Sequence, residues 1–194
     1  MPSEKGMSYL GAAREGVVFV RRYVPYGAAN DVRQFATLDL LKLIRQLLAM
    51  DRLLATRKAI DSDEETGFVA EEDALRRIQV WADDVMKKHG GNCGEQSALA
   101  FQFLRKKGIK PLDWAHFLHR DHAFVLIGRP SADSHITVGS PPDWVRDLVI
   151  CDPWKGRAGY LLEMLAEYPP GEIGTNLFYN PTTDSLATWV NKNA

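Results

Sequence analysis

Hydrophobic residues recur at helical spacing in three stretches of the chain. The first stretch covers residues 37–60, where leucine and isoleucine return every three or four positions. The second covers residues 69–88, and Gly90-Gly91 follow it as a stop signal. The third begins at Cys93 and is apolar almost all round, which is typical of a buried helix. We therefore predict three helices, of which the last lies at the centre of the fold.

Short runs of β-branched and aromatic residues predict strands elsewhere. Residues 1–15 look loose, and a strand is expected over residues 16–20. Further strands are expected over residues 112–118, 122–127, 148–151 and 175–179, a loop or long hairpin over 128–142, and short helices over 159–168 and 184–193. Because helices come first and mostly adjacent strands follow, the pattern favours an α+β fold with an antiparallel sheet.

Composition and charge narrow the class of protein. The chain has 194 residues, with 24 basic and 25 acidic side chains and a net charge of −1, so its charge gives no reason to expect nucleic acid or an anionic membrane as a partner. No apolar run approaches the roughly 18 residues of a membrane-spanning helix. Residues 1–6 lack the pattern of a signal peptide. We expect synthesis into the cytoplasm, with secretion by a route independent of a signal peptide left open.

Cys93 lies where a helix start favours a thiolate. Asn92 is a good N-cap, and Glu95 is placed to complete a capping box. The unpaired N–H groups and the dipole of the first turn favour an anion at Cys93. The alternative is a small buried hydrophobic residue, but the flanking glycines and the cap favour a nucleophile. Cys151, inside the apolar run 148–151, is expected to be a buried, inert thiol that forms no disulfide.

A thiol nucleophile needs a base and a carboxylate that orients it, and the chain offers both. His122 begins one predicted strand and Asp152 ends another. Since side chains alternate along a strand, we expect His122, Phe124 and Leu126 to face the helix of Cys93.

Several of these assignments have rivals. His116 and His119 compete with His122, and on a helix the three would cluster as metal ligands. The segment reads as strand and turn, so no metal is expected. Asp152 precedes a proline and also suits an ordinary turn. Trp154 fits the core and the wall of a substrate pocket equally well.

Three segments with candidate reactive residues follow one another along the chain: Gly91-Asn92-Cys93-Gly94-Glu95, then Asp121-His122-Ala123-Phe124-Val125, then Val149-Ile150-Cys151-Asp152-Pro153-Trp154. Over residues 90–155 this order resembles the papain-like and transglutaminase-like superfamily of thiol enzymes. The compact papain-like domains of bacterial toxins and secreted effectors are the most similar members.

The resemblance implies a fold and a role for each residue. It implies a single papain-like domain over residues 1–194, with a helical part (1–89) and a catalytic core (90–194) in which the cysteine-bearing helix packs on a small antiparallel sheet. Cys93 would be the nucleophile, His122 the base and then the acid, and Asp152 the orienting carboxylate.

Two departures from the family pattern stand out. No glutamine shortly precedes Cys93, so the oxyanion hole would use the Cys93 N–H and a second donor, for which Asn92 is the candidate. The spacing from His122 to Asp152 is long, which makes residues 131–147 a candidate substrate loop.

The expected function is therefore a cysteine-dependent amide hydrolase that acts on a protein or peptide without a cofactor. It could be a protease or a protein-glutamine deamidase, or a transglutaminase if an amine replaces water, in the setting of a bacterial effector or toxin. Two alternatives stay open: a non-catalytic binding module, chaperone or adaptor of the same fold, and a cell-wall peptide amidase. The oligomeric state cannot be read from the sequence.

Overall fold

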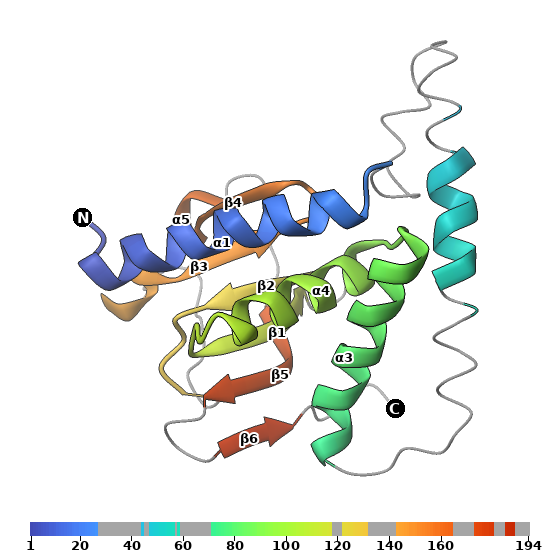
Figure 1. Cartoon of the computed structure of the whole chain (residues 1–194). Helices are drawn as coiled ribbons and strands as arrows, with labels where there is room; N and C mark the ends of the chain where they lie inside the picture. The colour runs from blue at the N-terminus through green and yellow to red at the C-terminus, as the bar shows by residue number, and fades with distance from the viewer. Residues whose placement is uncertain are drawn as a thin grey trace.

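The computed structural model describes residues 1–26, 44, 47–56, 58, 71–117, 122–131, 143–164, 173–180 and 185–188. Its elements are helices and strands in the order α1 (Glu4–Tyr23), α3 (Glu71–Lys88), α4 (Cys93–Lys106), β1 (Leu112–Phe117), β2 (Ala123–Ile127), η2 (Asp143–Asp147), β3 (Val149–Asp152), β4 (Arg157–Tyr160), α5 (Leu161–Met164), β5 (Ile173–Asn180) and β6 (Ser185–Thr188). Residues 47–56 form a further helix (Figure 1).

The strands form one six-stranded sheet in the order β4-β3-β2-β1-β5-β6, and all neighbouring strands pair antiparallel. The chain therefore has the α+β class and the antiparallel sheet that its pattern predicts. The expected strands over 112–118, 122–127, 148–151 and 175–179 are confirmed as β1, β2, β3 and β5, with ends shifted by at most two residues.

The sheet separates two apolar clusters. On one face, α1 and α4 pack on the sheet and α3 packs on α4 (Figure 1). The strand residues that join this larger cluster are Leu112, Val125, Ile127, Val149 and Cys151. The other face packs with η2 and α5 through Ala115, Phe117, Phe124, Leu126, Ile150, Leu161 and Met164. Helix α4 is buried along most of its length, as predicted.

The expected facing of β2 is wrong. Val125 and Ile127 point toward α4, whereas Phe124 and Leu126 lie in the opposite cluster. His122 precedes β2 and is not itself a strand residue. Its ring nevertheless stacks on Phe124 with centroids 6.1 Å apart, so the wrong part of the expectation is that Phe124 and Leu126 face α4.

The first 20 residues also differ from expectation. The loose segment over 1–15 and the strand over 16–20 are both wrong, because Glu4–Tyr23 is a single helix. The valines of residues 17–20 have high strand propensity, yet packing overrides it. The buried face of α1 is built partly from small residues, which a hydrophobic pattern does not reveal: Gly6, Ala12, Ala13 and Gly16. A Cβ on Gly16 would lie 3.3 Å from Cys151 Sγ, so this glycine lets α1 approach β3 closely.

Other expectations are met in part or fall outside the described residues. The helix predicted over 184–193 is wrong for Ser185–Thr188, which form strand β6 beside β5. The region 159–168 contains the end of β4 and one turn of helix, α5. The helices over 37–60 and 69–88 are confirmed where they are described. Most of the candidate substrate loop, residues 132–142, lies outside the described residues.

No helix in the described part of the chain is both long and apolar enough to cross a membrane.

Replacing Gly16 by leucine should destabilise the fold by about 1–3 kcal/mol, because the larger side chain would force α1 away from Cys151 and Leu104. Leucine is the better helix former, so a loss of stability would have to come from packing. Gly11→Leu is the matched control, since nothing lies within 4 Å of a Cβ there. Denaturant unfolding of both variants tests this. Equal stability of the two variants would contradict the packing of α1 on β3.

Candidate active site

The loop before Cys93 is clamped by backbone from a distant part of the chain. A Cβ on Gly90 would lie 2.3 Å from the carbonyl carbon of Arg52, so only glycine fits beside the helix of residues 47–56. Thr56 Oγ1 donates a hydrogen bond to the Gly90 carbonyl oxygen at 3.1 Å. His89 has φ of 60° and ends α3, and its Nδ1 lies 3.1 Å from the carbonyl oxygen of Tyr23. Contacts with two other helices thus set the path of the loop.

The start of α4 has the predicted cap. Asn92 is extended, with φ −93° and ψ −159°, and its backbone N–H donates to Glu95 Oε2 at 3.1 Å. Gln96 Nε2 donates to the Gly91 carbonyl oxygen at 2.7 Å. The structural role expected for Glu95 is confirmed. Asn92 Oδ1 faces the first turn without reaching hydrogen-bond geometry, and it has no partner among the described residues.

Cys93 is the first residue of α4 and is 6% exposed. Its thiol is recessed rather than displayed on the surface. The N–H groups of Cys93 and Gly94 belong to the first turn, where a helix has no internal acceptors for them. An anion beside Cys93 would therefore meet backbone donors and the positive end of the helix dipole.

Sheet pairing brings His122 to Asp152. Strand β2 runs antiparallel to β3 with Val125 opposite Cys151, so Asp152 at the end of β3 lies near the start of β2. His122 Nε2 and Asp152 Oδ2 are 2.7 Å apart. Asp152 is fully buried, and its other oxygen accepts a hydrogen bond from the Lys155 N–H at 3.0 Å. Both carboxylate oxygens are thus held.

The same imidazole is hydrogen-bonded to the thiol of Cys93. Because Asp152 engages Nε2, the nitrogen available to Cys93 is Nδ1. The structure therefore brings together the three residues that the sequence selects, with the imidazole between the thiol and the carboxylate. A base beside a thiol, oriented from its far side by an acid, is the geometry of an activated nucleophile.

The pKa of His122 reflects these contacts. Burial of the ring lowers it, but the hydrogen bonds to Asp152 and Cys93 and their charges act in the opposite direction and raise the pKa from 6.5 to about 9. The imidazolium is thus the favoured form at neutral pH. Since the folded pKa lies above the unfolded one, protonated His122 stabilises the fold fully below pH 6.5, and this contribution is lost as the pH rises through about 9.

Three aromatic rings surround the imidazole. Phe117 and Phe124 stack on it with ring centroids 6.2 and 6.1 Å away, and Trp154 meets it edge-on at 5.1 Å. The Phe117 N–H also donates to the His122 carbonyl oxygen at 3.1 Å. Trp154 is half-buried, so it lies against the site and not in the interior of the core.

The turn that follows Asp152 rests on α1. Gly156 has φ of +70°, and a Cβ there would collide with the guanidinium group of Arg21. The Gly156 N–H donates to the Pro153 carbonyl oxygen at 3.0 Å, which closes the turn that carries Trp154 and Lys155. A helix far away in the sequence therefore supports the residues next to the carboxylate.

The rival residues lie elsewhere or outside the described residues. His116 is in β1, opposite Ala123, while His119 is outside the described residues. Three other carboxylates flank the predicted strands and are weaker alternatives to Asp152: Asp121 is outside the described residues, Asp147 accepts hydrogen bonds from Ser3, and Asp143 pairs with Arg146. A search of the described part of the chain finds no group of three or more residues that could hold a metal ion.

Both cysteines are free. Cys151 is fully buried and its Sγ lies 3.4 Å from the Ala13 carbonyl oxygen. Burial raises the pKa of the Cys151 thiol far above its usual range. The expectation of an inert buried thiol at this position is confirmed.

Sequence reasoning missed an aromatic pair beside the start of α4. Trp81 meets Trp114 edge-on with ring centroids 5.4 Å apart, and a Cβ on Gly94 would lie 3.6 Å from the Trp81 ring. Trp114 Nε1 donates to Ser97 Oγ at 2.7 Å, and Ser97 Oγ donates to the Gly94 carbonyl oxygen at 2.8 Å. The sequence pattern does not reveal this contact, because Trp81 is in α3 and Trp114 is in β1, and the two meet only in the folded chain.

In comparisons with family models, curated proteins and solved structures, none matches this chain. Any inference about function must therefore rest on the geometry of the side chains themselves.

Replacing Asp152 by asparagine should lower the pKa of His122 from about 9 toward 6.5, because a neutral amide stabilises the imidazolium far less than a carboxylate does. An NMR titration of the His122 ring measures the change. Asp143→Asn is the control, since Asp143 is exposed and pairs with Arg146. A His122 midpoint unchanged by Asp152→Asn would contradict the assigned partnership.

Proposed function

We propose that this protein is a papain-like cysteine hydrolase that cleaves an amide bond in a protein or peptide. The observation that carries the proposal is the single imidazole of His122, which contacts the thiol of Cys93 and, through Nε2, the buried carboxylate of Asp152 at 2.7 Å. The α+β architecture, with α4 packed on an antiparallel sheet, supports a papain-like fold.

The chemistry begins with an ion pair. The Cys93 proton resides on His122, which Asp152 stabilises as imidazolium. The thiolate attacks the amide carbonyl carbon, and the carbonyl oxygen becomes an oxyanion. The C–N bond then breaks as His122 donates its proton to the leaving amine, which leaves a thioester on Cys93. Water, deprotonated by His122, attacks the thioester and releases the acid and the free thiol.

Donors for the oxyanion come from the first turn of α4. The backbone N–H of Cys93 is positioned there, as in the N-terminal turn of any helix. The Asn92 backbone N–H is engaged by Glu95, so the contribution expected of Asn92 would have to come from its side-chain amide. Trp154, edge-on to His122 and half-buried, is the candidate for one wall of the substrate pocket.

The type of enzyme depends on which amide is cleaved and on which molecule accepts the acyl group from Cys93. A main-chain amide makes it a protease, and a glutamine side chain with water makes it a deamidase that releases ammonia. Cys93 is recessed, so substrate must reach inward to it in either case. The resemblance to toxin and effector domains supports a target protein outside the producing cell.

Iodoacetamide should alkylate Cys93 below pH 7, because the imidazolium of His122 stabilises the thiolate. Cys151 should stay unlabelled in the folded protein, since it is fully buried. His122→Ala should abolish selective labelling at low pH, whereas His116→Gln, at the rival histidine, should preserve it. Peptide mass spectrometry after a short pulse gives the measurement. Equal labelling of wild type and His122→Ala would contradict the ion pair.

Intact-mass analysis of candidate target proteins tests the reaction itself. A gain of about 1 Da per site indicates deamidation, and fragments indicate proteolysis, because the two reactions differ only in which amide is cleaved. Cys93→Ala should abolish either change, and His122→Ala should slow it by about 10²–10⁴-fold. Turnover that survives Cys93→Ala would refute the cysteine mechanism. If Cys93 labels selectively but neither change occurs in any target, a binding module becomes the better account.

A further inference from the structure

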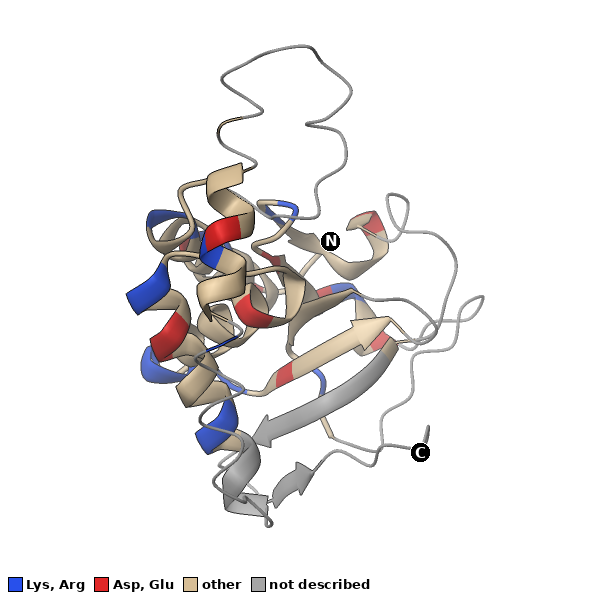
Figure 2. Ribbon diagram, turned by 90° about the vertical axis from the view of Figure 1, so that its right-hand side faces the viewer, with Lys and Arg blue, Asp and Glu red and all other residues tan. Residues whose placement is uncertain are grey.

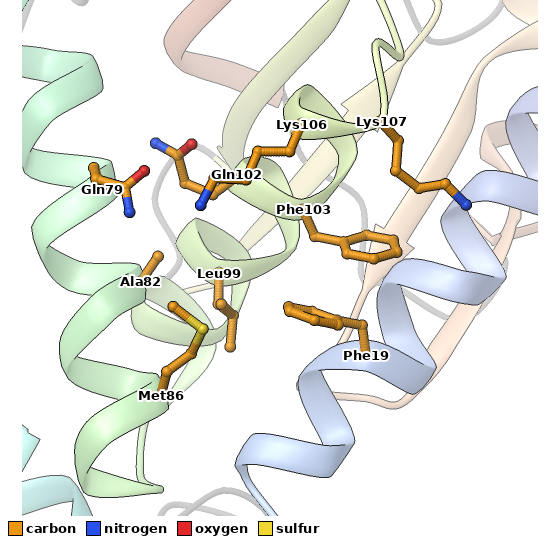
Figure 3. Close-up of a pocket in the computed structure, with 9 residues that line it drawn as sticks. All are labelled: Phe19, Gln79, Ala82, Met86, Leu99, Gln102, Phe103, Lys106 and Lys107. Carbon is orange, nitrogen blue, oxygen red and sulfur yellow. The ribbon is translucent and has the colours of Figure 1, made fainter.

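A second site lies at the other end of α4, between α1, α3 and α4. It is a cavity of about 240 Å³. Most of its wall is apolar and is formed by Phe19, Ala82, Met86, Leu99 and Phe103 (Figure 3). Phe19 and Phe103 stack with ring centroids 4.4 Å apart, which closes the side toward α1. None of the residues that line this cavity belongs to the candidate active site.

The opposite end of the cavity is polar. Figure 3 shows the amides of Gln79 and Gln102 and the amine of Lys106 gathered at that end, away from Met86 and Phe19. Gln79 Nε2 donates to Asp83 at 2.7 Å, and Gln102 Nε2 donates to the Leu75 carbonyl oxygen at 3.3 Å. One amide N–H of each glutamine is therefore engaged by α3.

One acceptor at this end lacks a donor. Gln102 is only 2% exposed, and its Oε1 is buried with no hydrogen-bond partner among the described residues. An unsatisfied buried carbonyl oxygen costs about 1–3 kcal/mol, so it is an unusual feature to keep in a helix interface. A hydroxyl or N–H group entering the cavity would satisfy it.

The lining residues supply two cations, Lys106 and Lys107, and no carboxylate, although Gln79 is bonded to the Asp83 carboxylate just outside the lining. Lys106 is exposed, and no carboxylate among the described residues forms an ion pair with it. Its neighbour Lys107 pairs with Glu15 and lies over the Phe103 ring at 5.5 Å from the centroid. In Figure 2, most of the Lys and Arg positions on the described ribbon lie on helices, with Asp and Glu positions among them, and few lie on strands.

We propose that this cavity binds a small amphipathic carboxylate that carries a hydroxyl or N–H group next to its acid. The apolar tail would lie against Met86, Leu99 and the Phe19–Phe103 pair, the carboxylate would meet Lys106, and the neighbouring donor would bond to Gln102 Oε1. The volume is below the roughly 300–1,000 Å³ of a site for a drug-sized molecule, so the ligand must be small. This site does not depend on the function proposed for Cys93.

Methyl NMR titration of the full chain with 2-hydroxyoctanoate tests the proposal. Saturable shifts are expected at the methyl groups of Met86 and Leu99, while those of Leu126 and Ile150, on the other face of the sheet, stay in place. Octanoate, which lacks the hydroxyl, should bind about threefold more weakly, because one hydrogen bond is lost. Lys106→Gln should weaken 2-hydroxyoctanoate binding about fivefold, as expected for an exposed ion pair.

Lys110→Gln is the matched control for charge, since Lys110 is an exposed lysine that does not line the cavity, and it should leave the affinity unchanged. Gln102→Met keeps the length of the side chain and should remove the preference for 2-hydroxyoctanoate over octanoate. Absence of saturable shifts at Met86 and Leu99 would overturn the proposal. Affinity that is the same in wild type and Lys106→Gln, or the same for both acids in wild type, would overturn the ligand class.

Discussion

The hydrogen bond between His122 and Asp152 is the interaction on which the candidate site depends. A fully buried carboxylate is costly unless it is paired, and here the imidazole and the Lys155 N–H engage its two oxygens. The pairing of β2 with β3 brings the two residues together, and the turn after Asp152 rests on α1. Because Asp152 holds the imidazole of His122 through Nε2, the ring keeps one orientation, in which Nδ1 faces Cys93.

Local chemistry explains why the Cys93 helix could be predicted from the sequence. Asn92 and Glu95 form the cap, and the glycines come directly before it. Because these residues are neighbours in the sequence, the start of the helix can be predicted without knowing the rest of the fold. The order of Cys93, His122 and Asp152 was also readable, since strand ends are natural positions for reactive side chains.

Features that depend on distant contacts could not be predicted. The core face of helix α1 is built partly from small residues with little hydrophobic signal, while its valines suggest a strand: Gly6, Ala12, Ala13 and Gly16. Strand β6 has four residues and is defined by its pairing with β5. The facing of β2 was inverted because all its residues from Phe124 to Ile127 are apolar, so the pattern does not show which side packs on α4.

Helix α4 connects the candidate active site with the proposed ligand cavity. Its first turn carries the thiol, and its last turns form the wall of the proposed ligand cavity together with α1 and α3. Each region contains a buried polar atom that lacks a hydrogen-bond partner among the described residues, Asn92 Oδ1 in the first and Gln102 Oε1 in the second. Binding of another molecule can supply the missing hydrogen bond of such an atom.

The close approach at Gly90 bears on how the chain can be divided. The expected boundary between a helical part and a catalytic core falls at this residue, yet the backbone of Arg52 touches it and Tyr23 contacts its neighbour His89. The loop before Cys93 therefore lies where early and late parts of the chain are in contact. Residues 90–194 expressed without residues 1–89 would lack the contacts of Arg52 and Tyr23 with the loop before Cys93. Those contacts set the path of the backbone into Cys93.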